Sequence, residues 1–337
     1  MKGFTYDDII LVPSYNHWDS RKSVDISMTC KKDKLKLGLP VMTANMDTIT
    51  EDRMANFIGS KGGIGVLHRF MSIERNIEIF KLCEYPTFVS IGCSSQEFER
   101  AESLRDAGAE LFCIDVAHAH AKYVGKTLSQ LRDIVSDNAC IMAGNVATYA
   151  GADYLASCGA DIVKVGIGGG SVCSTRLKTG FGVPNLTAIE NCSRVDRSIV
   201  ADGGIRYPGD IVKALAFGAD FVMIGSMLAG TDPTPGKVIW DKNTNREYKK
   251  YRGMASREVQ DEYRGGMAEW RTAEGVATEV PYRTDEDGII ADIIGGLRSG
   301  LTYGGALSIR ELQRKLEYIE ITDASRTENL PHRLIEG

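Results

Sequence analysis

The chain has 337 residues, of which 43% are hydrophobic and 25% are charged, and this is the composition of a globular protein with a large core. Its net charge of -5, from 40 basic and 45 acidic residues, argues against a binder of nucleic acid or of a membrane surface, because both carry a basic excess. The eight cysteines form no CxxC pair and the five histidines form no HExxH-like ligand spacing, so no structural zinc site is expected. The N-terminus lacks a signal-like segment and no apolar run could span a bilayer, which predicts a cytoplasmic protein.

Short apolar runs alternate with amphipathic segments from residue 39 onward. Eight of these runs are predicted to be strands, at residues 40–44, 63–67, 87–91, 111–116, 139–143, 161–165, 198–201 and 220–224. Their apolar character is continuous rather than alternating, which is typical of parallel strands covered on both faces. Helices are predicted between them at residues 51–60, 73–84, 96–107, 123–135, 149–157 and 208–216. Three of these helices end at a glycine that acts as a stop signal, namely Gly108, Gly159 and Gly218.

Eight strand–helix units predict an α/β fold of the (β/α)₈ TIM-barrel class, formed as one domain by residues 1–337. A doubly wound open sheet is the alternative, but eight evenly repeated units favour closure. In a barrel the active site lies at the carboxyl ends of the strands. Polar and glycine residues follow the predicted strands and would crowd that rim, among them Asn45, Asp115, Asn145 and Asp202.

The strand–helix pattern breaks after the eighth strand. Residues 229–285 are predicted to be an insertion on the carboxyl-terminal face of the barrel, beginning with a hairpin at residues 238–251. The polar stretch at residues 254–278 has little periodicity, and such a long excursion is more often a functional lid than filler. Residues 289–297 are predicted to be the last barrel helix, and residues 323–337 a polar tail that is mobile or ordered at an interface.

One stretch, residues 164–176, begins as a strand end, continues as a run of glycines and closes on Cys173, which is followed by two hydroxyl side chains and a cation. Glycines let the backbone approach a ligand closely, and successive backbone N–H groups in such a loop form an anion-binding concavity. A cysteine in that setting can be stabilised as a thiolate and act as a nucleophile. From these residues alone, a glycine-rich turn around a buried thiol is the equally weighted alternative.

Several motifs are typical of a single family. They are residues 6–8 (Tyr-Asp-Asp), 44–48 (Ala-Asn-Met-Asp-Thr), 143–146 (Ala-Gly-Asn-Val), 166–175, 201–205 (Ala-Asp-Gly-Gly-Ile), 251–254 (Tyr-Arg-Gly-Met) and 295–299 (Gly-Gly-Leu-Arg-Ser). On these motifs the chain resembles, over almost its whole length, the superfamily of inosine-monophosphate (IMP) dehydrogenases and guanosine-monophosphate (GMP) reductases.

Four features resemble the reductase branch. Dehydrogenases usually carry a regulatory insertion after the second strand, and the short connection from Leu67 to Ile73 leaves no room for one. They also carry a longer flap with an Arg-Tyr pair that activates water, whereas this chain has Tyr263-Arg264 in the reverse order. The flap segment 265–275 is similar to the reductase pattern, and so are residues 177–180 after the cysteine loop.

Other stretches resemble both branches. Residues 201–206 and 115–118 are similar to dehydrogenases as well as to some bacterial reductases, and Gly169 stands where the family usually has proline. A dehydrogenase without the regulatory module therefore remains the alternative, which would convert IMP, NAD⁺ and water to xanthosine monophosphate and NADH. Two rivals from other classes are a catalytically silent nucleotide-binding protein, which would not need a nucleophile, and a flavin-dependent barrel.

The resemblance to reductases implies NADPH-dependent reductive deamination of GMP to IMP and ammonia, through a covalent thioimidate on Cys173. It implies that Thr175 and Glu274 relay protons to the leaving amine. Without the resemblance, Glu274 reads as a solvated surface carboxylate and Thr175 as a loop-capping hydroxyl. The chain has no Gly-x-Gly-x-x-Gly strand-to-helix fingerprint for a Rossmann cofactor site.

The resemblance also implies three sets of binding residues in a homotetramer. The substrate set is Ser171, Asp202, Gly203, Gly204, Gly225, Ser226, Gly253, Met254, Ala255, Arg271 and Gly275. The cofactor set, in which Ser20 and Arg21 reach the adenosine end from a neighbouring subunit, is Ser20, Arg21, Arg69, Asp115, Val116, Ala117, Trp270, Ser299 and Thr302. A potassium ion is expected on the backbone carbonyls of Gly168, Gly170, Cys173 and Arg176.

Overall fold

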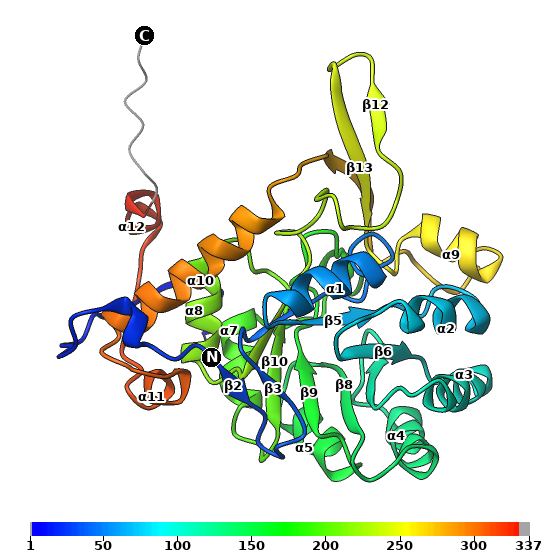
Figure 1. Cartoon of the computed structure of the whole chain (residues 1–337), viewed down its shortest axis with the longest axis horizontal. Helices are drawn as coiled ribbons and strands as arrows, with labels where there is room; N and C mark the ends of the chain where they lie inside the picture. The colour runs from blue at the N-terminus through cyan, green and yellow to red at the C-terminus, as the bar shows by residue number, and fades with distance from the viewer. Residues whose placement is uncertain (1, 330–337) are drawn as a thin grey trace.

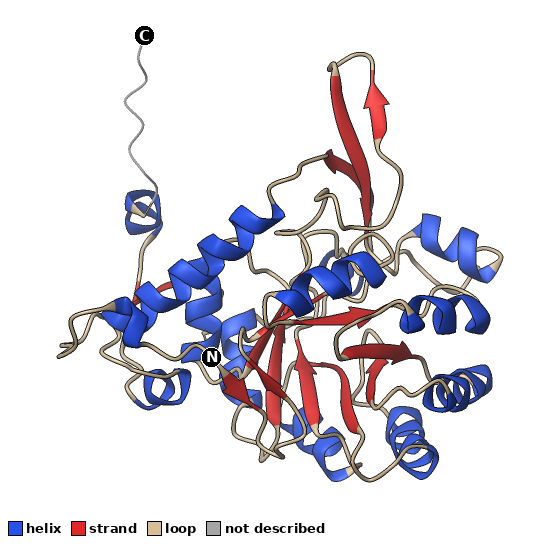
Figure 2. Cartoon of the chain, in the orientation of Figure 1, coloured by secondary structure: helices blue, strands red, loops and turns tan. Residues whose placement is uncertain are grey.

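The computed structural model describes residues 2–329, and its centre is a closed barrel of parallel strands surrounded by helices (Figures 1 and 2). The strands follow one another around the barrel in chain order, and the last pairs with the first through Val222 and Val41. They are β4 (Val41–Thr43), β5 (Ile64–Leu67), β6 (Thr87–Ile91), β7 (Leu111–Asp115), β8 (Cys140–Val146), β9 (Ile162–Val165), β10 (Ser198–Asp202) and β11 (Phe221–Ile224). Each strand overlaps one of the predicted apolar runs, so the predicted (β/α)₈ barrel is confirmed and the open-sheet alternative is wrong.

Helices pack around the outside of the barrel, as the alternating sequence pattern predicts. They are α1 (Asp52–Ser60), α2 (Ile73–Lys81), α3 (Ser95–Asp106), α4 (Lys122–Ile134), α5 (Tyr149–Ser157), α7 (Asn185–Cys192), α8 (Pro208–Ala216) and α10 (Glu286–Tyr303). The predicted glycine stops are confirmed, because Gly108, Gly159 and Gly218 have φ angles of 99°, 105° and 106°. Side chains that carry a Cβ rarely adopt such angles, whereas glycine adopts them freely.

Two helices differ from the prediction. Helix α7 was not foreseen, because residues 185–189 are all buried and the helix has no polar stripe to set its period. Helix α10 is longer than the predicted segment 289–297. Among residues 2–329 no helix is both long enough and apolar enough to cross a membrane.

Large apolar side chains fill the space inside the barrel and between barrel and helices. Phe88, Phe112 and Phe221, from three different strands, are all 0% exposed. Truncating one such phenylalanine to alanine costs about 3–5 kcal/mol of stability, because the lost contacts leave a cavity. The barrel is therefore a rigid frame that fixes the positions of the strand ends.

The insertion leaves the barrel after β11 and returns at α10. Its predicted hairpin is confirmed as β12 (Ile239–Asp241) paired with β13 (Arg246–Arg252), and it projects away from the barrel in Figure 1. The predicted lid holds helix α9 (Arg257–Arg264) and the first two residues of β14 (Ala277–Pro281), which pairs with β13, and neither element was foreseen.

Two strands far apart in the sequence pair in a small sheet outside the barrel. Strand β1 (Ile9–Leu11) pairs with β15 (Tyr318–Glu320), and a second small hairpin is formed by β2 (Met28–Thr29) and β3 (Lys36–Leu37). The predicted polar tail begins with helix α12 (Asp323–Glu328), and its last residues, 330–337, lie outside the described residues. The remaining short helices are η1 (Arg21–Ser23), α6 (Thr175–Thr179) and α11 (Ile309–Arg314).

Candidate active site

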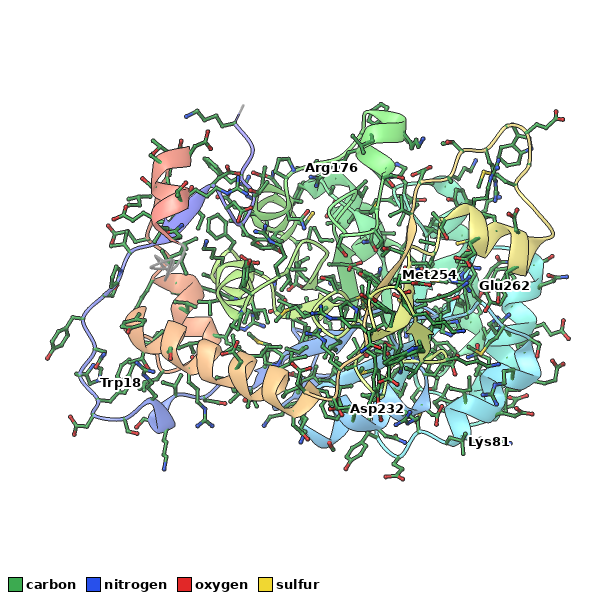
Figure 3. All side chains as sticks on the ribbon, turned by 90° about the horizontal axis from the view of Figure 1, so that it is seen from above. Trp18, Lys81, Arg176, Asp232, Met254 and Glu262 are labelled. Atoms are coloured by element: carbon green, nitrogen blue, oxygen red, sulfur yellow. The ribbon has the colours of Figure 1, made fainter. Side chains whose placement is uncertain are left out.

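A cavity of about 720 Å³ opens at the carboxyl ends of the barrel strands. It is lined by all of the predicted catalytic residues (Cys173, Thr175 and Glu274) and by all of the predicted substrate residues. Seen from above the insertion, Met254 lies over the barrel and Glu262 lies beside it on α9, whereas Trp18 lies at the far edge of the molecule (Figure 3). The structure therefore brings the predicted catalytic and substrate residues together around one cavity, and their roles stay predictions.

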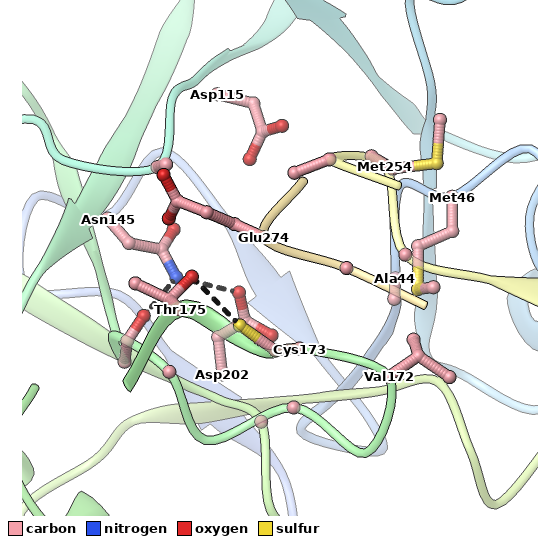
Figure 4. Close-up of a pocket in the computed structure, with 18 of the residues that line it drawn as sticks. Ala44, Met46, Asp115, Asn145, Val172, Cys173, Thr175, Asp202, Met254 and Glu274 are labelled. Atoms are coloured by element: carbon pink, nitrogen blue, oxygen red, sulfur yellow. Dashed lines mark hydrogen bonds between the residues drawn. The ribbon is translucent and has the colours of Figure 1, made fainter. Parts of the chain in front are cut away.

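The cysteine loop connects β9 to α6 and lies against the turn after β10. Gly166 has a φ of 148°, and a Cβ at this position would lie 2.0 Å from the carbonyl oxygen of Asp202. Only glycine lets the two backbones approach so closely. At the other end of the loop the Cys173 Sγ donates a hydrogen bond to Thr175 Oγ1 at 3.2 Å (Figure 4). The thiol of Cys173 thus has a hydroxyl partner and a half-buried position beside the cavity.

The space around residue 169 explains why glycine, rather than the proline expected from the family resemblance, stands at this position. A Cβ at residue 169 would meet the side-chain oxygen of Asn185 at 2.4 Å. That side chain donates a hydrogen bond to the carbonyl oxygen of Gly203, which follows β10. The asparagine therefore connects the turn after β10 to the cysteine loop and occupies the space that a larger residue 169 would need.

Glu274 reaches the cysteine through a short extended segment of the lid. Glu274 accepts a backbone hydrogen bond from Ser174 (2.8 Å), and Val276 donates one to Val172 (2.9 Å). On its other side this segment is bonded to Ala255, which accepts from the backbone N–H of Glu274 at 3.1 Å. The carboxyl group of Glu274 lies on the same side of the cavity as Thr175 and Cys173 (Figure 4).

Two carboxylates at the rim share one buried cation. The Lys164 Nζ lies 2.9 Å from Asp115 Oδ1 and 2.8 Å from Asp202 Oδ2. Burial by itself would lower the pKa of Lys164, but attraction to the two carboxylates outweighs it and raises the pKa above the ordinary value. Burial would likewise raise the pKa of Asp115, yet Lys164 lowers it. Lys164 is therefore an ammonium and Asp115 a carboxylate.

A second group of polar residues lines the cavity beside the glycine turns that follow β10 and β11. Gly204, after β10, has a φ of 76°, and Gly225 and Ser226 follow β11. The Ser171 hydroxyl is 2.9 Å from the Tyr251 hydroxyl, and burial raises the pKa of this phenol, which keeps its proton available for donation. Hydroxyl and backbone N–H donors on glycine turns are the groups that bind phosphate.

The remaining wall of the cavity is anchored by a buried ion pair. The Arg252 guanidinium contacts the Asp47 carboxylate, with Nε to Oδ2 at 3.0 Å, and also binds Glu262 of α9 at 2.8 Å. The backbone N–H of Asp47 donates to the Met254 sulfur at 3.4 Å. Burial would lower the pKa of Arg252, but its bonds to Asp47 and Glu262 raise it. The loop after β4 thus anchors both residues 253–255 and the lid helix.

The structure divides the predicted cofactor residues into two groups. Arg69, Asp115, Val116, Ala117 and Trp270 line the cavity. Within residues 2–329 the Nε of Arg69 is buried without a hydrogen-bond partner, which suits an anionic group of a dinucleotide. The second group lies outside this cavity and consists of Ser20, Arg21, Ser299 and Thr302. There the Arg21 guanidinium donates to the Ser299 hydroxyl at 2.9 Å on an exposed surface.

Two of the four backbone carbonyl oxygens predicted to bind potassium already accept a backbone hydrogen bond within this chain. The carbonyl oxygen of Gly170 already accepts from the backbone N–H of Cys173, and that of Arg176 accepts from Gly180. The Arg176 side chain lies against Gly168 and donates to the carbonyl oxygens of neighbouring loop residues, so a positive charge is already present there. Each of the predicted carbonyl oxygens retains a second lone pair, and the potassium site stays a prediction.

Asn145, Lys164 and Tyr251 line the cavity and are among the lining residues that were not predicted as site residues. Asn145 donates to Asp202 Oδ2 at 2.9 Å and so helps to hold that carboxylate. The motifs at residues 143–146 and 251–254 contain two of them, so the signal was present in the sequence. The signal for Lys164 was a lone charge within an apolar strand, which requires a buried partner.

A closed parallel barrel whose cysteine, hydroxyl and carboxyl groups meet at the carboxyl ends of its strands has the architecture of a (β/α)₈-barrel enzyme. Residues 3–332 match the family model described as the IMP dehydrogenase / GMP reductase domain. The chain belongs to this family, whose members are oxidoreductases of purine nucleotides that use a nicotinamide cofactor.

Named relatives come from both branches of the family. GMP reductase 2 of Bos taurus is 37% identical over 329 residues and covers 94% of both chains. Inosine-5'-monophosphate dehydrogenase of Cryptosporidium parvum is 35% identical over 387 residues, covering 98% of this chain and 95% of that protein.

Solved structures also carry both names. An inosine 5' monophosphate dehydrogenase from Legionella pneumophila is 68% identical, with a TM-score of 0.88 and coverage of 96% of this chain and 99% of that chain. A cysteine-to-alanine variant of GMP reductase from Trypanosoma brucei, in complex with guanosine 5'-monophosphate, is 26% identical with a TM-score of 0.90, covering 99% of this chain and 98% of that chain. The comparisons thus establish the family, and their names do not distinguish a GMP reductase from an IMP dehydrogenase.

Proposed function

We propose that this chain is a GMP reductase, which converts GMP and NADPH to IMP, NADP⁺ and ammonia. The observation that carries the proposal is the backbone pairing of the lid with the cysteine loop, which brings the Glu274 carboxyl group to the Cys173–Thr175 pair. A reductase must protonate a leaving amine beside the sulfur that holds the purine. A carboxyl group and a hydroxyl group at that place are suited to this task.

The chain's own groups account for the covalent steps. The Cys173 thiolate forms a bond to purine C2, and the C2–N bond breaks once Thr175 and Glu274 have supplied a proton to the amine, so that ammonia leaves and a thioimidate remains. A bound NADPH supplies the hydride that C2 receives. The electron pair of the C–S bond then returns to sulfur and IMP is released. GMP, NADPH and two protons thus give IMP, NADP⁺ and ammonium.

The polar groups of the rim would bind the nucleotide. Asp202 Oδ2 is taken by Lys164 and Asn145, and no group within residues 2–329 donates to Oδ1, so this oxygen can accept from the ribose hydroxyls. Ser171 and the glycine turns would bind the 5'-phosphate, and residues 253–255 would contact the base edge.

The split cofactor set supports a homotetramer in which neighbouring subunits share the dinucleotide. Arg69 and Trp270 border the cavity, and Trp270, whose side chain is 78% exposed, stacks with the Arg271 guanidinium at 4.6 Å. The surface formed by Ser20, Arg21, Ser299 and Thr302 lies elsewhere on the same chain. In our proposal that surface binds the adenosine end of the cofactor held by the adjacent subunit.

The second candidate is an IMP dehydrogenase, and the observation in its favour is the 68% identity to the Legionella pneumophila protein of that name. A dehydrogenase needs a group that activates water against the thioimidate. Tyr263 is not among the residues that line the cavity, and its ring packs 5.9 Å from the ring of Phe70 and 5.9 Å from the Arg252 guanidinium, behind the cavity wall that Phe70 helps to form. This placement favours the reductase.

Absorbance of the reduced nicotinamide separates the two reactions. We expect GMP to drive the oxidation of NADPH with release of one ammonia, and IMP with NAD⁺ to produce no NADH. Cys173→Ala should bind GMP and lose turnover. NADH formation from IMP and NAD⁺ would instead establish the dehydrogenase. GMP binding without turnover in either direction, unchanged by Cys173→Ala, would show a silent binding protein.

A further inference from the structure

Lys164 has a position that the proposed chemistry does not explain. It lies on β9 with its side chain 4% exposed, and it contacts one carboxylate at the end of β7 and another at the end of β10. These two strands are not neighbours, because β8 and β9 lie between them in the barrel. The ammonium of Lys164 therefore connects Asp115 and Asp202 across the interior of the rim.

The two carboxylates share the ammonium of Lys164 as a hydrogen-bonded partner. Both acceptor oxygens lie within 2.9 Å of the same nitrogen, so without its charge two anions would face each other in a half-buried site. Two like charges that share a site disfavour ionisation of both groups, so loss of the lysine would favour a proton on one of them. In the proposed function each carboxylate binds a different ligand, Asp202 the purine nucleotide and Asp115 the cofactor.

We propose that Lys164 is a positioning residue for both ligands, whose single ammonium holds Asp115 and Asp202 ionised and oriented at the same time. This inference rests on the proposed function. It follows that the two nucleotide pockets are coupled through a shared buried charge. Removing that charge should weaken the binding of both ligands, and binding of the second ligand should then require the loss of a proton.

Other charged and polar groups near the pair do not replace the lysine. Asn145 on β8 donates to Asp202, and Asn45 after β4 donates to Asp115, but both are neutral amides. Arg69, after β5, attracts Asp115 electrostatically, and among residues 2–329 no hydrogen bond joins the two side chains. The remaining neighbours are uncharged at neutral pH because burial raises their pKa values: Cys113 on β7, Tyr251 on β13 and Tyr6 near the N-terminus.

The test compares Lys164→Met with the wild-type protein by titration calorimetry, using IMP and NADPH. This pair reacts in neither candidate reaction, so binding is measured without turnover. We expect Lys164→Met to bind IMP and NADPH each roughly tenfold more weakly near about pH 6, the effect of one pKa unit of lost interaction. NADPH binding to the IMP-saturated variant should release a proton that the wild-type protein does not release, detected from buffers of different ionisation enthalpy. The affinity of the IMP-saturated variant for NADPH should increase as the pH rises.

Lys249→Met is the matched control. Lys249 is also buried, at 2% exposed, and its ammonium donates to the carbonyl oxygens of Thr231, Asp232 and Thr234 and not to Asp115 or Asp202. We expect this variant to lose stability and to retain the wild-type affinities and proton balance. Equal affinities and equal proton release in Lys164→Met and the wild type would overturn the inference.

A double variant covers the case in which Lys164→Met does not fold. Adding Asp115→Asn removes the repulsion and leaves Asp202 as a single carboxylate held by Asn145. IMP affinity should then return toward the wild-type value, NADPH affinity should stay low, and no proton should be released. Failure of IMP affinity to recover would refute the shared charge. A wild-type protein that binds both ligands but turns over neither substrate pair would refute the proposed function alone.

Discussion

Asp47→Asn should loosen the wall of the base pocket, because Asp47 and Arg252 form the ion pair that anchors it. The two side chains are 4% and 6% exposed, and the guanidinium makes several hydrogen bonds to the one carboxylate. Asparagine keeps the shape of the aspartate but removes its charge. Residues 253–255, which line the cavity, directly follow Arg252 and lose the fixed point that connects them to the loop after β4.

The expected cost follows from what remains around Arg252. Breaking a buried ion pair costs about 3–5 kcal/mol when the remaining charge has no partner. Arg252 keeps Glu262 at 2.8 Å, on a side chain that is 50% exposed, so we expect about 2 kcal/mol. At an unfolding entropy of about 2.1 cal/mol/K per residue, a chain of this length then loses about 3 °C in Tm. The KM for GMP should rise several-fold, while kcat changes less because Cys173 and Glu274 keep their contacts.

Thermal unfolding and steady-state kinetics measure the two effects on the same protein preparation. Glu78→Gln is the matched control, because Arg75 and Glu78 form an exposed pair with side chains 52% and 64% accessible. Such a pair contributes about 0–1 kcal/mol, so this variant should behave as wild type. If Asp47→Asn matches Glu78→Gln in both Tm and KM, the buried pair does not hold the pocket wall.

Two further predictions concern the reacting groups. Glu274→Gln should lower kcat by about 10²–10⁴-fold with little change in the KM for GMP, because amide and carboxyl have the same shape but only the carboxyl transfers a proton; unchanged kcat in steady-state assays would exclude it from the relay. Iodoacetamide at neutral pH should label Cys173 before Cys83 and Cys113, since burial raises the pKa of the latter two thiols to about 11 and about 12, and IMP should slow the labelling. Peptide mass spectrometry reads the order of modification, and labelling of Cys83 at an equal rate would contradict the assignment of the nucleophile.

The barrel could be predicted because each of its strands carries its own local signal. A buried parallel strand is apolar throughout, and a glycine such as Gly159 ends the preceding helix. The sequence therefore marks both the end of that helix and the start of the strand that follows. Helix α9 carries no such signal. Of the side chains described in this helix, only Val259 is fully buried, so the helix has no apolar stripe. The helix is held in place by the ion pair between Glu262 and Arg252 of β13, which no local pattern predicts. Strand β14 likewise exists through its pairing with β13.

In the candidate site, too, features with a local sequence signal could be predicted, whereas those that depend on tertiary contacts could not. Motifs identified the loops that bring Cys173, Thr175 and Asp202 to one rim, because every parallel strand ends on the same side of the barrel. The partners of Lys164 could not be predicted, since they come from strands that are separated by two others. Nor could the sequence show that Arg21 bonds Ser299 on a surface away from the cavity, because this depends on how η1 packs on α10.

Overall similarity does not distinguish the two candidate reactions. A structure named as a dehydrogenase at 68% identity and one named as a reductase at 26% identity superimpose on this chain with TM-scores of 0.88 and 0.90, so the same frame serves both names. The two reactions differ in what the lid must bring to the sulfur, which is either a proton donor for a departing amine or a group that activates water. In this chain the backbone pairing of residues 274–276 carries Glu274 to Cys173, while Tyr263 packs outside the cavity against Phe70. The lid therefore supplies the group that the reductase requires.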